Sequence, residues 1–291
     1  MVYQASPIKR RRRATKEEMA ARAAFFLQYA EENAPVTVRG LFYQAEVAGE
    51  PGIDKTEKGY NKVQNQVLKL RRSGWMDYRH IADETRYMRK PHTHDGWEDA
   101  LEDCARLYRK SLWAGTGVEV EIWLEKSALA GVIYPVTSEY DVPLMATGGH
   151  TSETFAFSAV DRLRGSGKTL VIYSLYDFDR SGLDAACSLQ EKVKRFGHEF
   201  GVKVQFNALG LNAQQVVDMN LSTRPPKRNS VADQKWPYDF AAELDAIPPG
   251  DLRQMVREAI ERHLPAHELT KLKSIEAAER RTLMQFIGGD L

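Results

Sequence analysis

Val118-Glu-Val-Glu-Ile-Trp-Leu-Glu125 is an apolar, β-prone run that ends in a carboxylate. Helix-forming residues follow it, and a second apolar run occupies residues 142–146. A third run, Thr169-Leu-Val-Ile-Tyr-Ser-Leu-Tyr176, leads directly into Asp177-Phe-Asp-Arg-Ser-Gly182. Short apolar strands that alternate with helical segments predict a parallel sheet with crossover helices. The sequence therefore predicts an α/β fold for this region.

Three carboxylates stand at the predicted strand ends, where ligands gather in such sheets. Glu125 ends the first strand, and Asp177 and Asp179 follow the third. If the backbone stays extended there, the two aspartates point the same way. Oxygen ligands without His or Cys favour a hard cation, so we expect Mg²⁺, with Mn²⁺ able to substitute. On its own, Asp-x-Asp-x-x-Gly is also typical of a solvated turn that caps the next helix.

These motifs resemble the Toprim pattern, in which a Glu ends one strand and Asp-x-Asp ends a later one. The chain is most similar to the family of the topoisomerase VI A subunit and the meiotic double-strand-break protein. The resemblance rests on Glu125-Lys126 and on Asp177 to Gly182, and the chain length suggests a compact, Mini-A-type member. The chain departs from the family at Arg180, where Pro is usual, and at Gly148-Gly149-His150. The family implies a Rossmann-like, mainly parallel Toprim domain.

Composition is that of a globular protein with an uneven charge. The chain has 291 residues, 43% of them hydrophobic, and no apolar run as long as a membrane span. Residues 1–90 hold 18 Lys+Arg and 11 Asp+Glu, a net +7, whereas the remainder carries −6. A basic N-terminal third indicates a local anionic partner. No secretory signal is recognisable, and Cys104 and Cys187 are isolated, so we expect buried thiols and a cytoplasmic protein. The resemblance to compact Mini-A-type members implies an association with nucleoid, phage or plasmid DNA.

The N-terminal third reads as three helices and a wing. Helices are expected over 15–32, from Thr37, and over 60–72, followed by a short strand or wing over 75–81. This order, with a basic third helix, fits a winged-helix DNA-binding domain, although the spacing is also that of an ordinary helical bundle. The basic residues that we expect to contact DNA are Lys62, Lys69, Arg71, Arg72, Arg86 and Lys126.

Tyr43 is the candidate nucleophile. Arg39-Gly-Leu-Phe-Tyr43 resembles the Arg-x-x-Tyr/Phe-Tyr motif that carries the catalytic tyrosine in this family. Arg39 lies four residues earlier, so on a helix it shares a face with Tyr43 and could favour the phenolate or hold phosphate. Without the resemblance, Tyr43 reads as a core aromatic residue paired with Phe42, and Arg39 as an exposed ion-pair partner.

The chain thus divides into three expected parts: a basic flexible tail over 1–14, a winged-helix domain over 15–95, and residues 96–291. The last part comprises a linker helix over 96–113, the Toprim domain and the C-terminal helices. His92 and His94 occupy a loop, and two His are too few to predict a metal site. Gly165-Ser-Gly-Lys-Thr169 ends like a phosphate-binding loop, but it follows a helix and opens a strand, which argues against ATP binding.

The resemblance implies type IIB topoisomerase-like cleavage and rejoining of double-stranded DNA. Tyr43 would form a 5′-phosphotyrosyl link, with Mg²⁺ held by Glu125, Asp177 and Asp179. It also implies a homodimer and a separate ATPase subunit. Two alternatives stay open. A Toprim nuclease that uses water predicts free 5′-phosphate ends, and a noncatalytic DNA-binding or segregation protein predicts that substitution of Asp177 leaves DNA binding intact.

Overall fold

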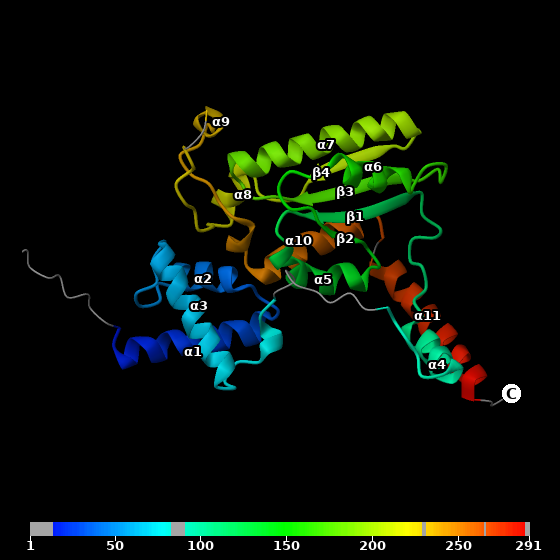
Figure 1. The fold of residues 1–291 in the computed structure, drawn as a ribbon, viewed down its shortest axis with the longest axis horizontal. Helices are drawn as coiled ribbons and strands as arrows, with labels where there is room; N and C mark the ends of the chain where they lie inside the picture. Colours follow the sequence, from blue (N-terminus) through cyan, green and yellow to red (C-terminus); the bar gives the residue numbers. More distant parts are fainter. Residues whose placement is uncertain (1–13, 83–90, 229–230, 265, 289–291) are drawn as a thin grey trace, which may run out of the picture.

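A four-stranded parallel sheet forms the centre of the molecule in the computed structural model, which describes residues 14–82, 91–228, 231–264 and 266–288. Its strands are β1 (Val118–Leu124), β2 (Leu144–Ala146), β3 (Thr169–Leu175) and β4 (Val204–Ala208), in the order β2-β1-β3-β4 (Figure 1). All three strand pairs are parallel. The predicted α/β class is confirmed.

Helices cover both faces of the sheet, which explains its continuous apolar strands. The helices α6 (Glu153–Asp161) and α7 (Arg180–Phe200) lie on one face, and α5 (Ala130–Glu139) and α10 (Pro249–Glu261) lie on the other (Figure 1). Trp123 and Ile172 pack toward α6 and α7, whereas Leu124 and Tyr173 belong to the core on the other face. This alternation along each strand follows from the two-residue period of β-structure.

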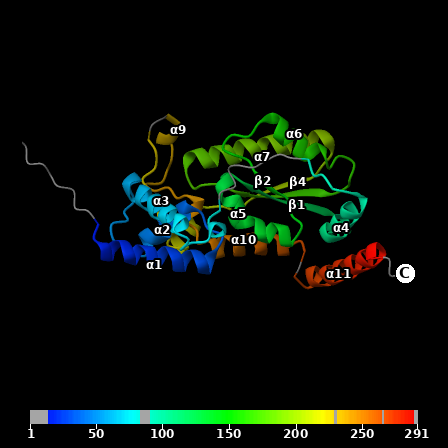
Figure 2. The same ribbon diagram turned by 60° about the horizontal axis from the view of Figure 1, so that its bottom comes forward.

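Three helices precede the sheet: α1 (Lys16–Asn33), α2 (Val38–Val47) and α3 (Glu57–Arg72). Each begins at a threonine whose side chain accepts a backbone N–H, and Thr15 forms a capping box with Glu18. Figure 2 shows these helices at one end of the molecule. The buried residues of α1–α3 and those on the α5–α10 face of the sheet form one hydrophobic cluster, so no gap separates the two cores.

The expected wing over Trp75–Ile81 is wrong. Tyr78–His80 forms a 3₁₀ turn that begins at Asp77, whose side chain accepts the backbone N–H of Arg79 at 2.8 Å. Ile81 makes only an isolated parallel bridge with Val36. A local side-chain bond to the backbone competes here with strand pairing, and the described part of this segment contains no hairpin.

The predicted linker helix is shorter than expected. The helix α4 (Trp97–Leu107) ends well before Trp113, because the chain then turns to α11 (Ala266–Gly288). There the backbone N–H of Lys110 donates to Glu276 at 2.9 Å. The remaining helices are α8 (Ala213–Asp218), α9 (Val231–Gln234) and the 3₁₀ turns Ser127–Leu129 and Leu244–Ala246.

Both cysteines are exposed, contrary to the expected burial. On α7 the buried stripe consists of residues such as Ala185, Leu189 and Val193, and Cys187 lies off that stripe. Cys104 lies between the buried positions Asp103 and Ala105 on α4 but faces solvent. The thiols therefore contribute nothing to the core.

Candidate active site at the carboxyl edge of the sheet

Glu125 and Asp177 lie where the order of the strands reverses. The strand β2 lies outside β1, and β4 lies outside β3, so the reversal falls between β1 and β3. Ligands of open parallel sheets bind at such a point, beyond the carboxyl ends of the strands. Glu125 directly follows β1, and the backbone N–H of Asp177 donates to Glu125 Oε2 at 3.1 Å. The two predicted site residues are therefore neighbours.

Asp179 is held at the same edge by two bonds. Phe178 pairs with Ala242 in an antiparallel bridge, so the backbone between the two aspartates is extended, as expected. Asp179 then begins α7, where its Oδ1 accepts the N–H of Gly182 at 2.8 Å. Its Oδ2 accepts from Arg224 Nη2 at 2.7 Å. A side chain at Gly182 would meet the carbonyl oxygen of Asp177 at 2.4 Å, so the turn requires glycine there. Capping and ion pairing thus both act on Asp179.

Two further acidic residues, Glu243 and Asp245, complete the edge, and the sequence analysis missed them. They belong to the segment that runs beside Asp177, whose Oδ1 accepts the backbone N–H of Leu244 at 2.8 Å. Asp245 is almost entirely buried, with 4% of its surface exposed. The sequence feature that could have identified these two residues is the acid-x-acid pattern Glu243-Leu-Asp245, which has the same spacing as Asp177 and Asp179.

Lys126 lies among these carboxylates, and this placement disagrees with its predicted contact to DNA phosphate. Its Nζ is 2.8 Å from Asp177 Oδ2 and 3.0 Å from both Glu243 Oε2 and Asp245 Oδ2. Burial acts to lower the pKa of Lys126, but Asp245, Asp177 and Glu243 outweigh it, and the pKa lies above its ordinary value. Lys126 therefore serves here as the internal counter-ion of the acidic edge.

The helix α2 is anchored to the same acidic residues. Arg39 donates from Nε and Nη2 to the two oxygens of Glu243, both at 3.0 Å. Thr37 Oγ1 donates to Asp245 Oδ1 at 2.8 Å. The fork of two parallel bonds fixes the orientation of Arg39 as well as its distance. The helix that carries Tyr43 thus contacts two carboxylates of the acidic edge directly.

Tyr43 lies one turn after Arg39, and the expected shared face is confirmed by the 5.9 Å between the Arg39 guanidinium carbon and the Tyr43 ring centre. Tyr43 is 6% exposed and lines a cleft of about 280 Å³ with Arg224 and Glu243. Burial, and then Glu243, raise the pKa of Tyr43 to about 12, against the opposing charge of Arg39. The charge of Arg39 thus favours the phenolate, as expected, but burial and Glu243 outweigh it.

The carboxylates differ in how fully they are neutralised. Burial raises the pKa of Glu125 and the pKa of Asp177 above their ordinary values. Burial also acts to raise the pKa of Glu243, but the hydrogen bonds and charges of Arg39 and Lys126 prevail and lower it to about 2. Glu125 and Asp177 are thus acids whose ionised form is disfavoured by burial.

The donor set at this edge fits a hard divalent cation in its chemistry, because every candidate ligand atom is a carboxylate oxygen. Glu125, Asp177 and Asp179 are not within single-ion reach of one another, since the one group of three candidate ligands within 4.8 Å in the described chain lies elsewhere. Lys126 and Arg224 already contact oxygens of Asp177 and Asp179. A cation bound at this edge would compete with these side chains for the same oxygens.

The other predicted DNA contacts lie on α3, except Arg86, which is outside the described residues. Lys69 and Arg72 are exposed, and Lys62 Nζ donates to the carbonyl of Gly52 at 2.5 Å. Arg71 stacks on Tyr78, with 4.3 Å between the guanidinium carbon and the ring centre. Lys69 and Arg72 are therefore the ones most free to contact a phosphate.

Comparison with known proteins does not assign the chain to a family, because no protein-family model and no curated protein matches it. None of the helices in the described ranges combines the length and the apolar character that a membrane span requires.

Proposed function

We propose that this chain cleaves and rejoins double-stranded DNA by tyrosine transesterification, in the manner of a type IIB topoisomerase A subunit. The observation that carries the proposal is the anchoring of α2 on the acidic edge. Arg39 binds Glu243 and Thr37 binds Asp245, while Lys126 joins both acids to Asp177. A tyrosine and a carboxylate cluster are the two halves that such a reaction needs, and here they adjoin within one chain.

In this proposal α1–α3 are a winged-helix unit reduced to its helices, and the sheet with its flanking helices is a Toprim domain. The position of Glu125 after β1 and of Asp177 after β3 supports this assignment. The chain would then be a compact, Mini-A-type relative of the topoisomerase VI A subunit and the meiotic double-strand-break protein. Its place of action would be nucleoid, phage or plasmid DNA in the cytoplasm.

The reaction begins with attack of Tyr43 Oη on a DNA phosphorus. A phosphorus–oxygen bond to Tyr43 forms, the bond to the 3′ oxygen breaks, and the phenol's proton leaves as the 3′ hydroxyl takes one up. Arg39, which contacts the Tyr43 ring and bonds Glu243, would orient the phosphate, and its charge favours the phenolate. The ester conserves the energy of the broken bond, so rejoining needs no cofactor.

Glu125, Asp177 and Asp179 would hold Mg²⁺, or Mn²⁺ in its place, after the three carboxylates move closer together and Lys126 and Arg224 release their oxygens. A bound divalent ion supplies positive charge for the phosphate oxygens as negative charge develops on them. The burial-raised pKa values of Glu125 and Asp177 support this role, because they identify carboxylates that an added cation would stabilise.

A two-fold homodimer would cut both strands, one site for each strand. The exposed Lys69 and Arg72 on α3 would contact the DNA backbone, with Lys62 beside them. Strand passage would need a separate ATPase subunit. The segment Gly165 to Thr169, which ends like a phosphate-binding loop, does not supply an ATP site. Lys168 of that loop instead bonds Glu119 at 3.0 Å, at the amino end of β3.

One observation favours a second candidate, a metal-dependent nuclease that uses water. Tyr43 is buried and its pKa of about 12 leaves roughly one phenol in 10⁵ ionised at neutral pH. A nuclease would need the carboxylate edge but not a tyrosine nucleophile. The two candidates differ in the ends they leave, covalently blocked in one and free in the other.

The test is cleavage of supercoiled circular DNA with Mg²⁺ or Mn²⁺, stopped with detergent and analysed with and without protease. We expect protein-linked linear DNA with the parent chain and none with Tyr43→Phe. Tyr60→Phe is the matched control, because Tyr60 lines the same cleft and stacks on Arg39 at 4.8 Å. Free-ended products that persist in Tyr43→Phe would establish the nuclease. DNA binding without cleavage, unchanged in Asp177→Asn, would indicate a noncatalytic segregation protein.

A further inference from the structure

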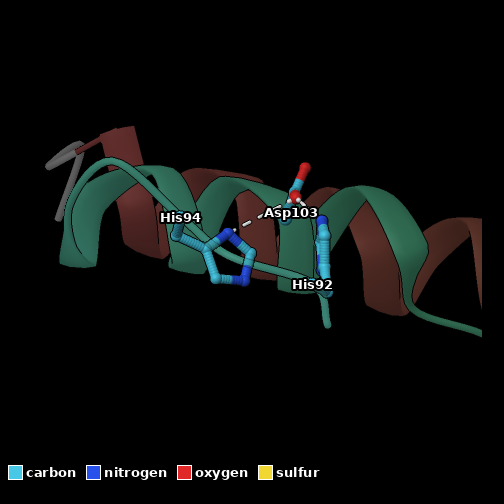
Figure 3. Close-up of side chains that lie close together, drawn as sticks. All are labelled: His92, His94 and Asp103. Carbon is cyan, nitrogen blue, oxygen red and sulfur yellow. Dashed lines mark ion pairs between the residues drawn. The ribbon is translucent and has the colours of Figure 1, made fainter. Parts of the chain in front are cut away.

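Two histidines and two aspartates lie close together beside α4. They are separate in sequence from the carboxylates at the edge of the sheet, and unlike that edge they include imidazole nitrogens. His92 and His94 precede the helix in a segment without regular secondary structure, two residues apart, and Asp99 and Asp103 lie on the helix itself. Residues four apart share a helix face, so Asp99 and Asp103 lie on the same side of α4. Figure 3 shows both imidazoles turned toward Asp103.

The distances match ligands that share one metal ion. His92 Nε2 lies 3.2 Å and His94 Nδ1 lies 3.5 Å from the same oxygen, Asp103 Oδ2. His94 Nδ1 is also 3.6 Å from Asp99 Oδ2. With metal–ligand bonds of about 2.0–2.2 Å, neighbouring ligands of a tetrahedral site are roughly 3.3–3.6 Å apart. The longer two contacts exceed an ordinary N–H···O hydrogen bond, which measures about 2.7–3.2 Å.

The orientation of Asp103 supports this geometry. Arg106 Nη2 pairs with Oδ1 of Asp103, which leaves Oδ2 for the two imidazoles. Asp103 is 8% exposed, so its carboxylate is held rather than free in solvent. Asp99 Oδ2 accepts the backbone N–H of Asp95 at 3.2 Å. The contact of Arg106 with Oδ1 of Asp103 is of the kind that is typical of metal sites, because it orients a ligand through an atom that does not face the ion.

We propose that His92, His94 and Asp103 bind a divalent transition-metal ion, with Asp99 or water completing its coordination. Two imidazoles and a carboxylate favour Zn²⁺ and similar ions over Mg²⁺. The described residues contain no other group of three such ligands within 4.8 Å. Bound metal ties residues 92–94 to α4, which in turn lies beside α11 (Figures 1 and 2). The site stabilises this end of the molecule and is independent of the proposed cleavage reaction.

The test is titration of the chelator-treated full chain with Zn²⁺, followed by calorimetry, and with Co²⁺, followed by its visible absorption. We expect one equivalent to bind, with the intense visible bands of low-coordinate Co²⁺, in the presence of excess Mg²⁺. The double variant His92→Gln/His94→Gln should bind at least about 100-fold more weakly, and Asp103→Asn at least about 10-fold more weakly. Both histidines are exposed, so their replacement should leave the circular dichroism spectrum unchanged.

Two controls locate the site. His267→Gln removes an exposed imidazole beside Glu268 on α11, and Asp177→Asn alters the carboxyl edge of the sheet. Both should bind Zn²⁺ as the parent does. Equal affinity of the double histidine variant and the parent would overturn the proposal, and so would a loss of affinity confined to Asp177→Asn.

Discussion

At the residue scale, Lys126 explains why the clustered carboxylates of the acidic edge are stable in the absence of a metal ion. One ammonium lies within 3.0 Å of oxygens from Asp177, Glu243 and Asp245. Carboxylates so close together repel one another unless a cation neutralises them. Lys126 provides that cation in the free chain, and a divalent ion would take over part of its role.

Replacement of Lys126 by Met should therefore separate stability from metal affinity. Loss of the ammonium leaves buried carboxylates uncompensated, so we expect the metal-free chain to lose about 3 kcal/mol of unfolding free energy. The affinity for Mn²⁺ should rise at least about tenfold, because the ion no longer competes with an ammonium. Urea unfolding and calorimetric Mn²⁺ titration measure the two quantities.

Lys168→Met is the control for that experiment. Its side chain is 24% exposed against 26% for Lys126, and it pairs with Glu119 at the opposite edge of the sheet. Lys168→Met should lose stability without any gain in Mn²⁺ affinity. Equal Mn²⁺ affinity of Lys126→Met and the parent would contradict the competition between ammonium and metal.

The sequence shows part of this site and hides the rest for a physical reason. Glu125, Asp177 and Asp179 were predictable because strand ends can be read from the pattern of apolar residues. The environment of Lys126 was not, because its partner Glu243 is 117 residues away in the chain. Nothing local distinguishes a lysine that contacts phosphate from one that pairs with distant carboxylates.

At the scale of elements, α2 and the segment that contains the 3₁₀ turn Leu244–Ala246 form the contact that creates the candidate site. Arg39, Thr37 and Gln44 each bond to that segment, the last to the carbonyl of Ala246 at 3.2 Å. The strands and most helices lie where the pattern of apolar residues predicted them. The predicted wing is absent because the side chain of Asp77 caps a local 3₁₀ turn, whereas a hairpin would need a second strand to pair with.

A double-mutant cycle between Arg39 and Glu243 measures this contact. We expect Arg39→Ala and Glu243→Gln each to destabilise the chain, with a coupling energy of about 1 kcal/mol, because both variants remove the same pair of bonds. Arg39→Lys should recover little of it, since an ammonium cannot form the two-bond fork. Additive effects in denaturant unfolding would show that the pair does not anchor α2.

His263 gives the contact between the end of α10 and β3 a dependence on pH. Its Nε2 lies 2.9 Å from the hydroxyl of Tyr173, and burial followed by the charge of Arg262 lowers the pKa of His263. The folded chain thus binds a proton less readily than the unfolded chain, whose His has a pKa of about 6.5. Stability contributed by neutral His263 is present above that pH and falls as the pH drops below it.

We therefore expect the unfolding free energy to decrease between about pH 7 and pH 5, with a smaller decrease in His263→Gln. His267→Gln, which removes an exposed imidazole on α11, should keep the slope of the parent. Urea unfolding at a series of pH values gives the slopes. Identical slopes for His263→Gln and the parent would show that this residue does not link folding to protonation.

At the scale of the whole molecule, one hydrophobic cluster joins the N-terminal helices to the α5–α10 face of the sheet. The continuous core fixes Tyr43 against the acidic edge rather than leaving it on a mobile arm, and this explains both its burial and its raised pKa. The composition of the chain predicted two units of opposite charge. It could not predict their shared core, which depends on contacts between distant segments.

The most direct measurement of the central claim is the chemical identity of the residue joined to DNA. The chain is incubated with DNA and Mg²⁺ or Mn²⁺, trapped with detergent, treated with nuclease and trypsin, and analysed by mass spectrometry. Cleavage after Arg39 and Lys55 releases Gly40 to Lys55, in which Tyr43 is the only tyrosine. The account predicts a nucleotide on that peptide, lost in Tyr43→Phe and retained in Tyr60→Phe. DNA that is cut while the peptide stays unmodified would contradict it.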